Sequence, residues 1–179
     1  AMELVLEAYP TTLALAGVAM VLSITLAIIV GAIAAYKPGG VFDRISSMAS
    51  LAGASAPDFW IAITGILIFA VTLRWLPTSG VGDLPYWILP IGVLMLRPFG
   101  LMVQVVRAAM LGALSSAYVK TARAKGVGET AVIFVHALRN ACLSIVTVAG
   151  DLTVGMINGA VIVETVFGWP GVGKLMIDS

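Results

Sequence analysis

Charged residues are scarce in this sequence, and their scarcity excludes a water-soluble globular protein. Only 11% of the 179 residues are charged, whereas 60% are hydrophobic, and the mean hydropathy is +1.08. A soluble domain carries roughly 25% charged and about 45–50% apolar residues. Water could not solvate the surface of such a chain, so a lipid bilayer must surround most of it.

The side chains that build disulfides, metal centres and active sites are also nearly missing. One cysteine, Cys142, and one histidine, His136, make neither a disulfide framework nor a cluster of metal ligands. No string of the form GxxxxGK[ST] occurs, so we expect no ATP hydrolysis by the chain itself. No nucleophile lies beside a candidate base, and no two carboxylates have the spacing of an enzyme. The sequence therefore indicates a non-enzymatic protein without a cofactor of its own.

Long apolar stretches are what the sequence has in abundance, and they lie at residues 9–36, 45–73, 86–106 and 137–163. About 20 apolar residues suffice to cross the hydrocarbon core as a helix. A membrane barrel would need many short alternating segments, which are absent, so each stretch must be helical. The expected fold is an all-α membrane protein with four spans, the second of them kinked at Pro57–Asp58.

The basic residues are distributed unequally between the connections, and this predicts the orientation of the chain. Basic loops lie on the cytoplasmic side of a membrane protein. Of the basic residues in the connections, only Arg74 and Lys174 fall on the predicted external side. Seven basic residues fall on the predicted cytoplasmic side: Lys37, Arg44, Arg107, Lys120, Arg123, Lys125 and Arg139.

The connection at residues 110–135 is longer than two neighbouring spans need, and it reads MLGALSSAYVKTARAKGVGETAVIFV. We expect one short helix over Ala117–Lys125, ended by Gly126, and a second that begins at Gly128–Glu129 and runs into the fourth span. One interpretation is a basic helix that anchors to anionic lipid, with about 1 kcal/mol from each basic residue near the surface. This interpretation would make the chain a lipid-surface anchor or a non-transport membrane scaffold.

The order of residues in this connection favours a second interpretation. YVKTARAKGVGETAVIFVHALRNA resembles the cytoplasmic "EAA" loop of binding-protein-dependent ABC importer permeases. TARAKG followed by HALRNA is similar in particular to the dipeptide/oligopeptide/nickel permeases, as are VIVETVFGWPGVGKLMIDS and the external LPTSG turn. The resemblance covers essentially the whole chain. It implies a type I ABC importer transmembrane domain, a MetI-like helical bundle.

In the family that this chain resembles, the loop forms a coupling helix that docks on a cytoplasmic ATPase subunit. Two departures from the usual pattern are Ala117, where an acidic residue is frequent, and Ser144, where a proline is usual. The resemblance implies that small residues let this helix approach the ATPase subunit closely and that Gly126 lets the chain reverse sharply after the helix. It assigns the coupling role to Tyr118, Lys120, Thr121, Ala122, Arg123, Ala124, Lys125 and Gly126.

The resemblance also implies a function and a set of partners. The chain would be a permease subunit in the cytoplasmic (inner) membrane of a bacterium or archaeon, importing short peptides or else nickel chelates or other small polar solutes by alternating access. Its partners would be a second related permease, two ATPase subunits that bind ATP and Mg, an external binding protein and membrane lipid, without nucleic acid. Six spans are usual in that family, so we expect a fragment, in which residues 164–179 are external.

Polar residues inside the spans form the remaining candidate site. Arg97 lies near the middle of the third span and Asp151 at a comparable depth in the fourth, where charged groups rarely face lipid. One interpretation pairs Arg97 with Asp151 and makes neighbouring polar groups interhelical hydrogen-bonding partners. The other makes these groups line a translocation path, and the two interpretations can coexist. The candidate path residues are Arg97, Thr147, Asp151 and Asn158, and the last three share a polar stripe with Ser144 and Gly155.

Overall fold

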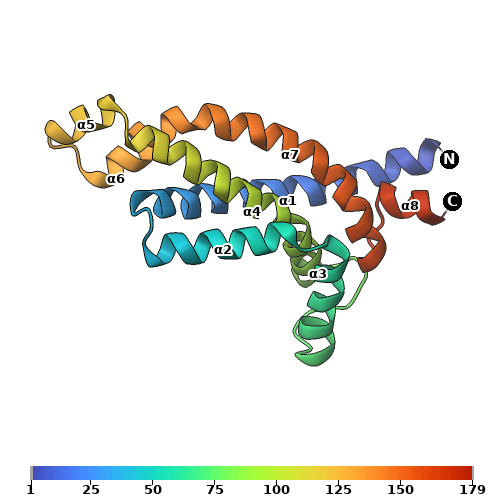
Figure 1. Cartoon of the computed structure of the whole chain (residues 1–179). Coiled ribbons are helices and arrows are strands. Elements are labelled where there is room, and N and C mark those ends of the chain that lie inside the picture. Colours follow the sequence, from blue (N-terminus) through green and yellow to red (C-terminus); the bar gives the residue numbers. More distant parts are fainter. Residues whose placement is uncertain (1, 179) are drawn as a thin grey trace. The chain divides into compact units, whose positions relative to one another are not determined.

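The computed structural model describes residues 2–178, with side chains for residues 8–177, and is built from helices joined by short connections (Figure 1). No strand occurs among these described residues. In chain order the elements are α1 (Met2–Tyr36), α2 (Val41–Ser55), α3 (Asp58–Gly65), the π-helical η1 (Ile66–Thr72), α4 (Leu84–Leu114), α5 (Ala117–Ala124), α6 (Glu129–Ala131), the π-helical η2 (Val132–Ala137), α7 (Leu138–Phe167) and α8 (Val172–Asp178).

The chain divides into two compact units, and each unit combines segments that are distant in the sequence. The first unit comprises residues 2–23, 55–98 and 152–178. The second comprises Ile24–Ala54 and Phe99–Asp151. Helices α1, α4 and α7 each contribute one part to the first unit and one part to the second.

Three helical segments are long and apolar enough to cross a membrane, namely Ala8–Tyr36, Leu84–Leu114 and Glu129–Phe167. A fourth span exists only if α2 and the α3–η1 segment are counted together. Two of these helical segments, Leu84–Leu114 and Glu129–Phe167, are longer than the spans predicted at 86–106 and 137–163. Sequence beyond a span can stay helical when it is amphipathic and another helix covers its apolar face.

The second predicted span, 45–73, is interrupted rather than kinked. Helix α2 ends at Ser55, and Pro57 has an extended backbone with φ −66° and ψ 134°. The Pro57 carbonyl accepts the N–H groups of Trp60 at 3.0 Å and Ile61 at 3.1 Å, which begins α3. A proline disfavours the helical conformation of the residue before it, and this explains why the helix stops instead of bending.

In the second unit, α4 packs against α1 through small residues. A Cβ atom added to Gly31 would lie 2.8 Å from the Cβ atom of Val106, closer than real side chains approach one another. Ala27, Ala32 and Ala35 of α1 are buried as well. Small residues allow two helix backbones to come close, which is how helices associate when lipid offers no hydrophobic driving force.

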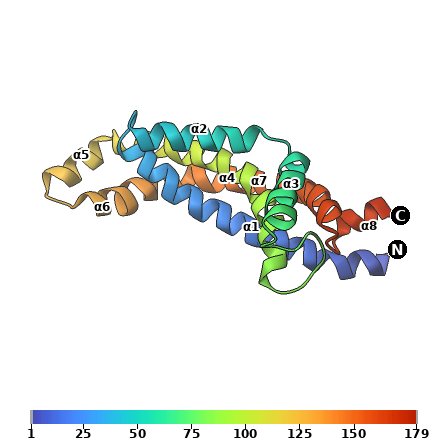
Figure 2. The same cartoon turned by 90° about the horizontal axis from the view of Figure 1, so that it is seen from below.

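Helix α2 meets α4 differently, through a line of polar groups that we call the polar seam (Asp43, Ser47, Ser50, Gln104 and Arg107). Two guanidinium nitrogens of Arg107 bind the Asp43 carboxylate, and the NH2–Oδ2 distance is 2.8 Å. Gln104 donates from Nε2 to the Ser50 hydroxyl at 2.7 Å. Figure 2 shows α2 running alongside this part of α4. The polar residues of α2 thus face a protein neighbour.

In the first unit, a buried carboxylate ties the beginning of α8 to α1, and we call this group the Glu164 latch (Thr12, Glu164, Val172 and Gly173). The Glu164 side chain is fully buried and accepts the Thr12 hydroxyl at 2.6 Å and the Gly173 amide at 2.8 Å. The Thr12 hydroxyl in turn accepts the Val172 amide at 3.1 Å. Hydrogen bonds to a charged group contribute about 1.5–3 kcal/mol each.

Two tryptophans and a backbone contact complete the first unit near this latch. The ring of Trp169 is fully buried and meets Trp87 edge to face, with ring centroids 4.8 Å apart. The Gly80 amide donates to the Phe167 carbonyl at 2.9 Å, which joins the connection before α4 to the end of α7. Figure 1 shows α8 beside the first turns of α1. The segment after α7 is therefore held at several points.

The latch leaves no space for a side chain at Gly171, because an added Cβ atom would overlap the Glu164 carboxylate. We expect Gly171→Ala to destabilise the protein by about 1–3 kcal/mol, as overpacking does. Gly155→Ala is the matched control, since nothing lies within 4 Å of its added Cβ atom. Thermal unfolding of the detergent-solubilised protein measures both, and an unchanged midpoint for Gly171→Ala would contradict the latch.

Candidate functional site

The connection between α4 and α7 forms a helical hairpin at one end of the second unit, next to the turn between α1 and α2 (Figure 1). Helix α5 spans Ala117–Ala124, which confirms the predicted short helix. Gly126 has φ +79°, a left-handed conformation that suits glycine, and the chain reverses there. Helix α6 then begins at Glu129, as predicted, and continues through η2 into α7.

One side of α5 faces inward and fixes the helix to the rest of the unit. Val119 is fully buried and Ala122 is 9% exposed, and α5 packs on η2. The sequence places Ala122 among the residues that meet a docking partner. That assignment stays a prediction, and in this structure Ala122 lies on the inward side of α5 with only 9% of its surface exposed.

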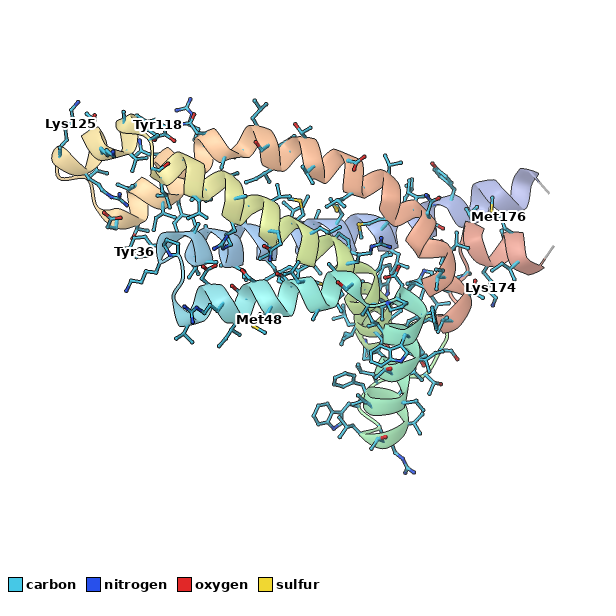
Figure 3. The ribbon with its side chains drawn as sticks, in the orientation of Figure 1. Tyr36, Met48, Tyr118, Lys125, Lys174 and Met176 are labelled. Carbon is cyan, nitrogen blue, oxygen red and sulfur yellow. The ribbon has the colours of Figure 1, made fainter. Side chains whose placement is uncertain are left out.

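The opposite side of α5 is free of neighbours in the described part of the chain. Figure 3 shows Lys125 at the tip of the hairpin, pointing away from the helices. The Thr121 hydroxyl is exposed but already donates to the Ala117 carbonyl at 3.0 Å. A partner would therefore meet small side chains framed by an aromatic ring and two ammonium groups. The exposed predicted residues are Tyr118, Lys120, Thr121, Arg123, Ala124, Lys125 and Gly126.

Arg123 has a role that the sequence motif did not reveal. Its Nε atom lies 2.9 Å from Oε1 of Glu129 and its NH2 atom 3.1 Å from Oε2, so the ion pair is bidentate. This hydrogen bonding raises the pKa of Arg123. Solvent screens the charges of this exposed pair, so its main effect is geometric. The pair joins the two sides of the Gly126 reversal, and only the opposite charges six residues apart hinted at it.

The predicted path residues on α7 all lie on exposed surface. Thr147 and Asp151 belong to the second unit and Asn158 to the first, and each is exposed. The Thr147 hydroxyl donates to the Leu143 carbonyl at 2.9 Å, which satisfies it within its own helix. Arg97 is also exposed and belongs to the first unit. Because Arg97 and Asp151 lie in different units, their pairing stays a prediction.

The described residues contain no group of three or more histidine, cysteine, aspartate or glutamate side chains that could hold a metal ion. Two surfaces of the chain are therefore the candidate functional sites. One is the hairpin that carries α5, which presents a shaped and basic surface. The other is the exposed polar stripe of α7, which interrupts an otherwise apolar helix.

Comparison with known proteins relates this arrangement to transport systems. The sequence model of the family described as "Binding-protein-dependent transport system inner membrane component" matches residues 27–179. The di/tripeptide transport system permease protein DppB of Pseudomonas aeruginosa (strain UCBPP-PA14) is 40% identical over 97% of this chain and 60% of its own length. The oligopeptide transport system permease protein AppB of Bacillus subtilis (strain 168) is 36% identical over 99% and 59%. This chain thus spans about three fifths of these relatives.

A solved structure supports the same fold. One chain of the crystal structure of an amino acid ABC transporter with histidines superposes with a TM-score of 0.72, over 99% of this chain and 77% of that one. The sequence identity is 15%, so the similarity concerns the fold alone. The helical fold of this chain is thus shared with that chain of the transporter.

The inward packing of α5 can be tested by two equal substitutions on its two sides. Ala122→Leu should displace α5 from η2 and speed amide hydrogen exchange in α5 at least about tenfold, since overpacking costs about 1–3 kcal/mol. Ala124→Leu, on the exposed side, should leave the exchange of α5 unchanged. Equal exchange in the two variants would show that Ala122 does not hold the helix.

Proposed function

This chain belongs to the family of binding-protein-dependent transport system inner membrane components, and from that membership we propose that it is part of a permease subunit of an ABC importer. Members of this family are inner membrane components, and this location agrees with the long apolar helices of the chain. Relatives over 97–99% of the chain are peptide transport system permeases. Energy would come from partner subunits that bind ATP and Mg, since the chain has no phosphate-binding loop motif.

The observation that carries the proposal is the way in which the hairpin is built. Val119 and Ala122 face η2, the Arg123–Glu129 pair joins the two sides of the reversal, and the outer side of α5 is left exposed. A helix held at a fixed angle, with small residues outward, suits docking into a cleft of an ATPase subunit. A lipid anchor would need charges and an apolar face, but no fixed turn.

The proposed substrate is a short peptide, because both compared relatives are named for di/tripeptide or oligopeptide transport. Nickel chelates and other small polar solutes are the second candidates. Transport would proceed by alternating access with a second permease, two ATPase subunits and an external binding protein. Closure of the ATPase pair on ATP would move the hairpin and, through it, the helices on either side.

The exposed polar stripe of α7 is proposed to line the translocation path. Asp151 is an exposed carboxylate in the middle of an apolar helix, and such groups face a water-filled cavity or a protein partner rather than lipid. Thr147 and Asn158 continue the same face. Arg97, exposed in the first unit, is a further candidate for contact with a polar substrate.

Docking can be tested with a bulky residue on the outer side of α5. We expect Ala124→Trp to reduce co-purification of the ATPase subunits at least about tenfold, because a single misfit at a packed interface can remove 1–3 kcal/mol. Met48→Trp on the exposed face of α2 is the matched control for bulk in the same unit and should leave co-purification unchanged. Full co-purification of the Ala124→Trp variant would count against docking through α5. Loss of binding to anionic vesicles instead would favour the lipid-anchor alternative.

The role of the polar residues can be tested by sequential substitution in the complete transporter. We expect Asp151→Ala to reduce peptide uptake at least about tenfold, as loss of a charged binding group does. Arg97→Leu is then added in the same background, with folding and uptake measured separately. Restored folding without uptake would favour a path role, whereas restored uptake would show that the two residues form a structural pair.

A further inference from the structure

Helix α2 has the polar residues of the seam inside, and its large apolar residues outside together with Arg44. Its buried residues are Asp43 and Ser50, both polar. Val41, Ile45 and Met48 are 63–76% exposed, and Figure 3 shows Met48 pointing away from the neighbouring helices. Hydrophobic burial within the chain therefore does little to hold α2 in place. Its attachment to the rest of the second unit depends on hydrogen bonds.

These hydrogen bonds are those of the polar seam, and they follow matching periods on the two antiparallel helices. On α2 the seam residues recur at Asp43, Ser47 and Ser50, and on α4 at Gln104 and Arg107. Asp43 receives both Arg107 and the Gly39 amide, the latter at 2.7 Å. Gln104 reaches the Ser47 carbonyl at 3.4 Å as well as the Ser50 hydroxyl. Such bonds fix the register of the two helices, whereas an apolar contact would let them slide.

The seam is reinforced by close backbone approach at its other end. A Cβ atom added to Gly100 of α4 would overlap the Ser50 carbonyl and lie 3.0 Å from the Cβ atom of Ala54. The two helices are thus in contact from Arg107 back to Gly100. Helix α4 then continues without interruption to Leu114, and only Ser115 and Ser116 separate it from α5.

We propose that the polar seam is a coupling device: it makes α2 move as one body with the part of α4 that carries the α5 hairpin. A displacement of α5 would pass along α4 and reach α2 through the Asp43–Arg107 and Gln104–Ser50 contacts. Asp43 and Arg107 act as positioning residues, because each acts through the contact that joins α2 to α4. This proposal rests on the proposed function, since it concerns the motion that an ATPase would impose on the hairpin.

The proposal is tested by distances between spin labels in the complete reconstituted transporter. Labels are placed at Met48→Cys on α2 and Ser115→Cys beside α5, both exposed, in a Cys142→Ser background that removes the native thiol. The distance between the two labels should be the same in the nucleotide-free and ATP-bound states. With Arg107→Met, we expect the same distance to broaden or to differ between the two states.

Uptake and ATP hydrolysis measured on the same variants separate coupling from simple instability. Arg107→Met should reduce uptake about tenfold while ATP hydrolysis falls less than about twofold, since loss of coupling uncouples the two activities. Arg107→Lys, which keeps one charged bond to Asp43 but loses the bidentate geometry, should restore part of the uptake. Ser46→Ala is the matched control on α2, because the Ser46 hydroxyl bonds only within its own helix, to the Asp43 carbonyl.

The possible results decide between the proposals. The first contrary result is a distance between the two labels that changes with nucleotide although the seam is unsubstituted and uptake is normal. It would overturn the coupling role and leave the proposed function intact. Equal loss of uptake and hydrolysis in Arg107→Met, without rescue by Arg107→Lys, would also overturn it. A complete transporter without any ATP-driven uptake would overturn the proposed function and, with it, the coupling proposal.

Discussion

A polar group buried inside a protein must find a partner, because no water is there to replace the hydrogen bonds that it loses. Glu164 satisfies this constraint with a hydroxyl and a backbone amide, and Asp43 with a guanidinium and another amide. Leaving a buried polar group without its partner costs about 1–3 kcal/mol, so these contacts hold their helices in place. The Glu164 latch and the polar seam each join segments that are distant in the sequence. Each therefore organises one of the two units.

The same constraint indicates what surrounds the polar groups that the chain leaves exposed. Asp151 and Asn158 lie on the surface of a helix that is apolar elsewhere, so this face is suited to water or to another protein. Helix α2 shows the reverse arrangement, with Val41 and Met48 outward and Asp43 inward. Its outer face is suited to acyl chains. The distribution of polar groups thus distinguishes an exposed face suited to lipid from one suited to water or protein.

The α5 hairpin illustrates how residues of one short motif divide their tasks. Val119 and Ala122 hold the helix, and Arg123 binds Glu129 across the reversal at Gly126. The remaining exposed residues are left for a partner. The proposal that the hairpin docks on an ATPase subunit uses this division, because the held side fixes the angle at which the exposed side is presented. The polar seam offers a physical route by which motion of the hairpin could reach a second helix.

The sequence by itself determined the class of the protein and much of its local structure. Hydropathy predicts the long helices, the excess of basic residues predicts an orientation, and the order TARAKG with Gly126 predicts the short helix and its reversal. These features depend on neighbouring residues, whose chemistry is visible along the chain.

Tertiary structure alone decided the rest: the burial of Ala122, and the partners of Asp43 and Glu164. Each depends on which distant segment packs alongside. Asp43 and Arg107 are 64 residues apart, and Thr12 and Glu164 are 152 apart. No local pattern encodes such pairs, because burial of a polar group costs free energy unless a hydrogen-bonding partner from a distant segment offsets it.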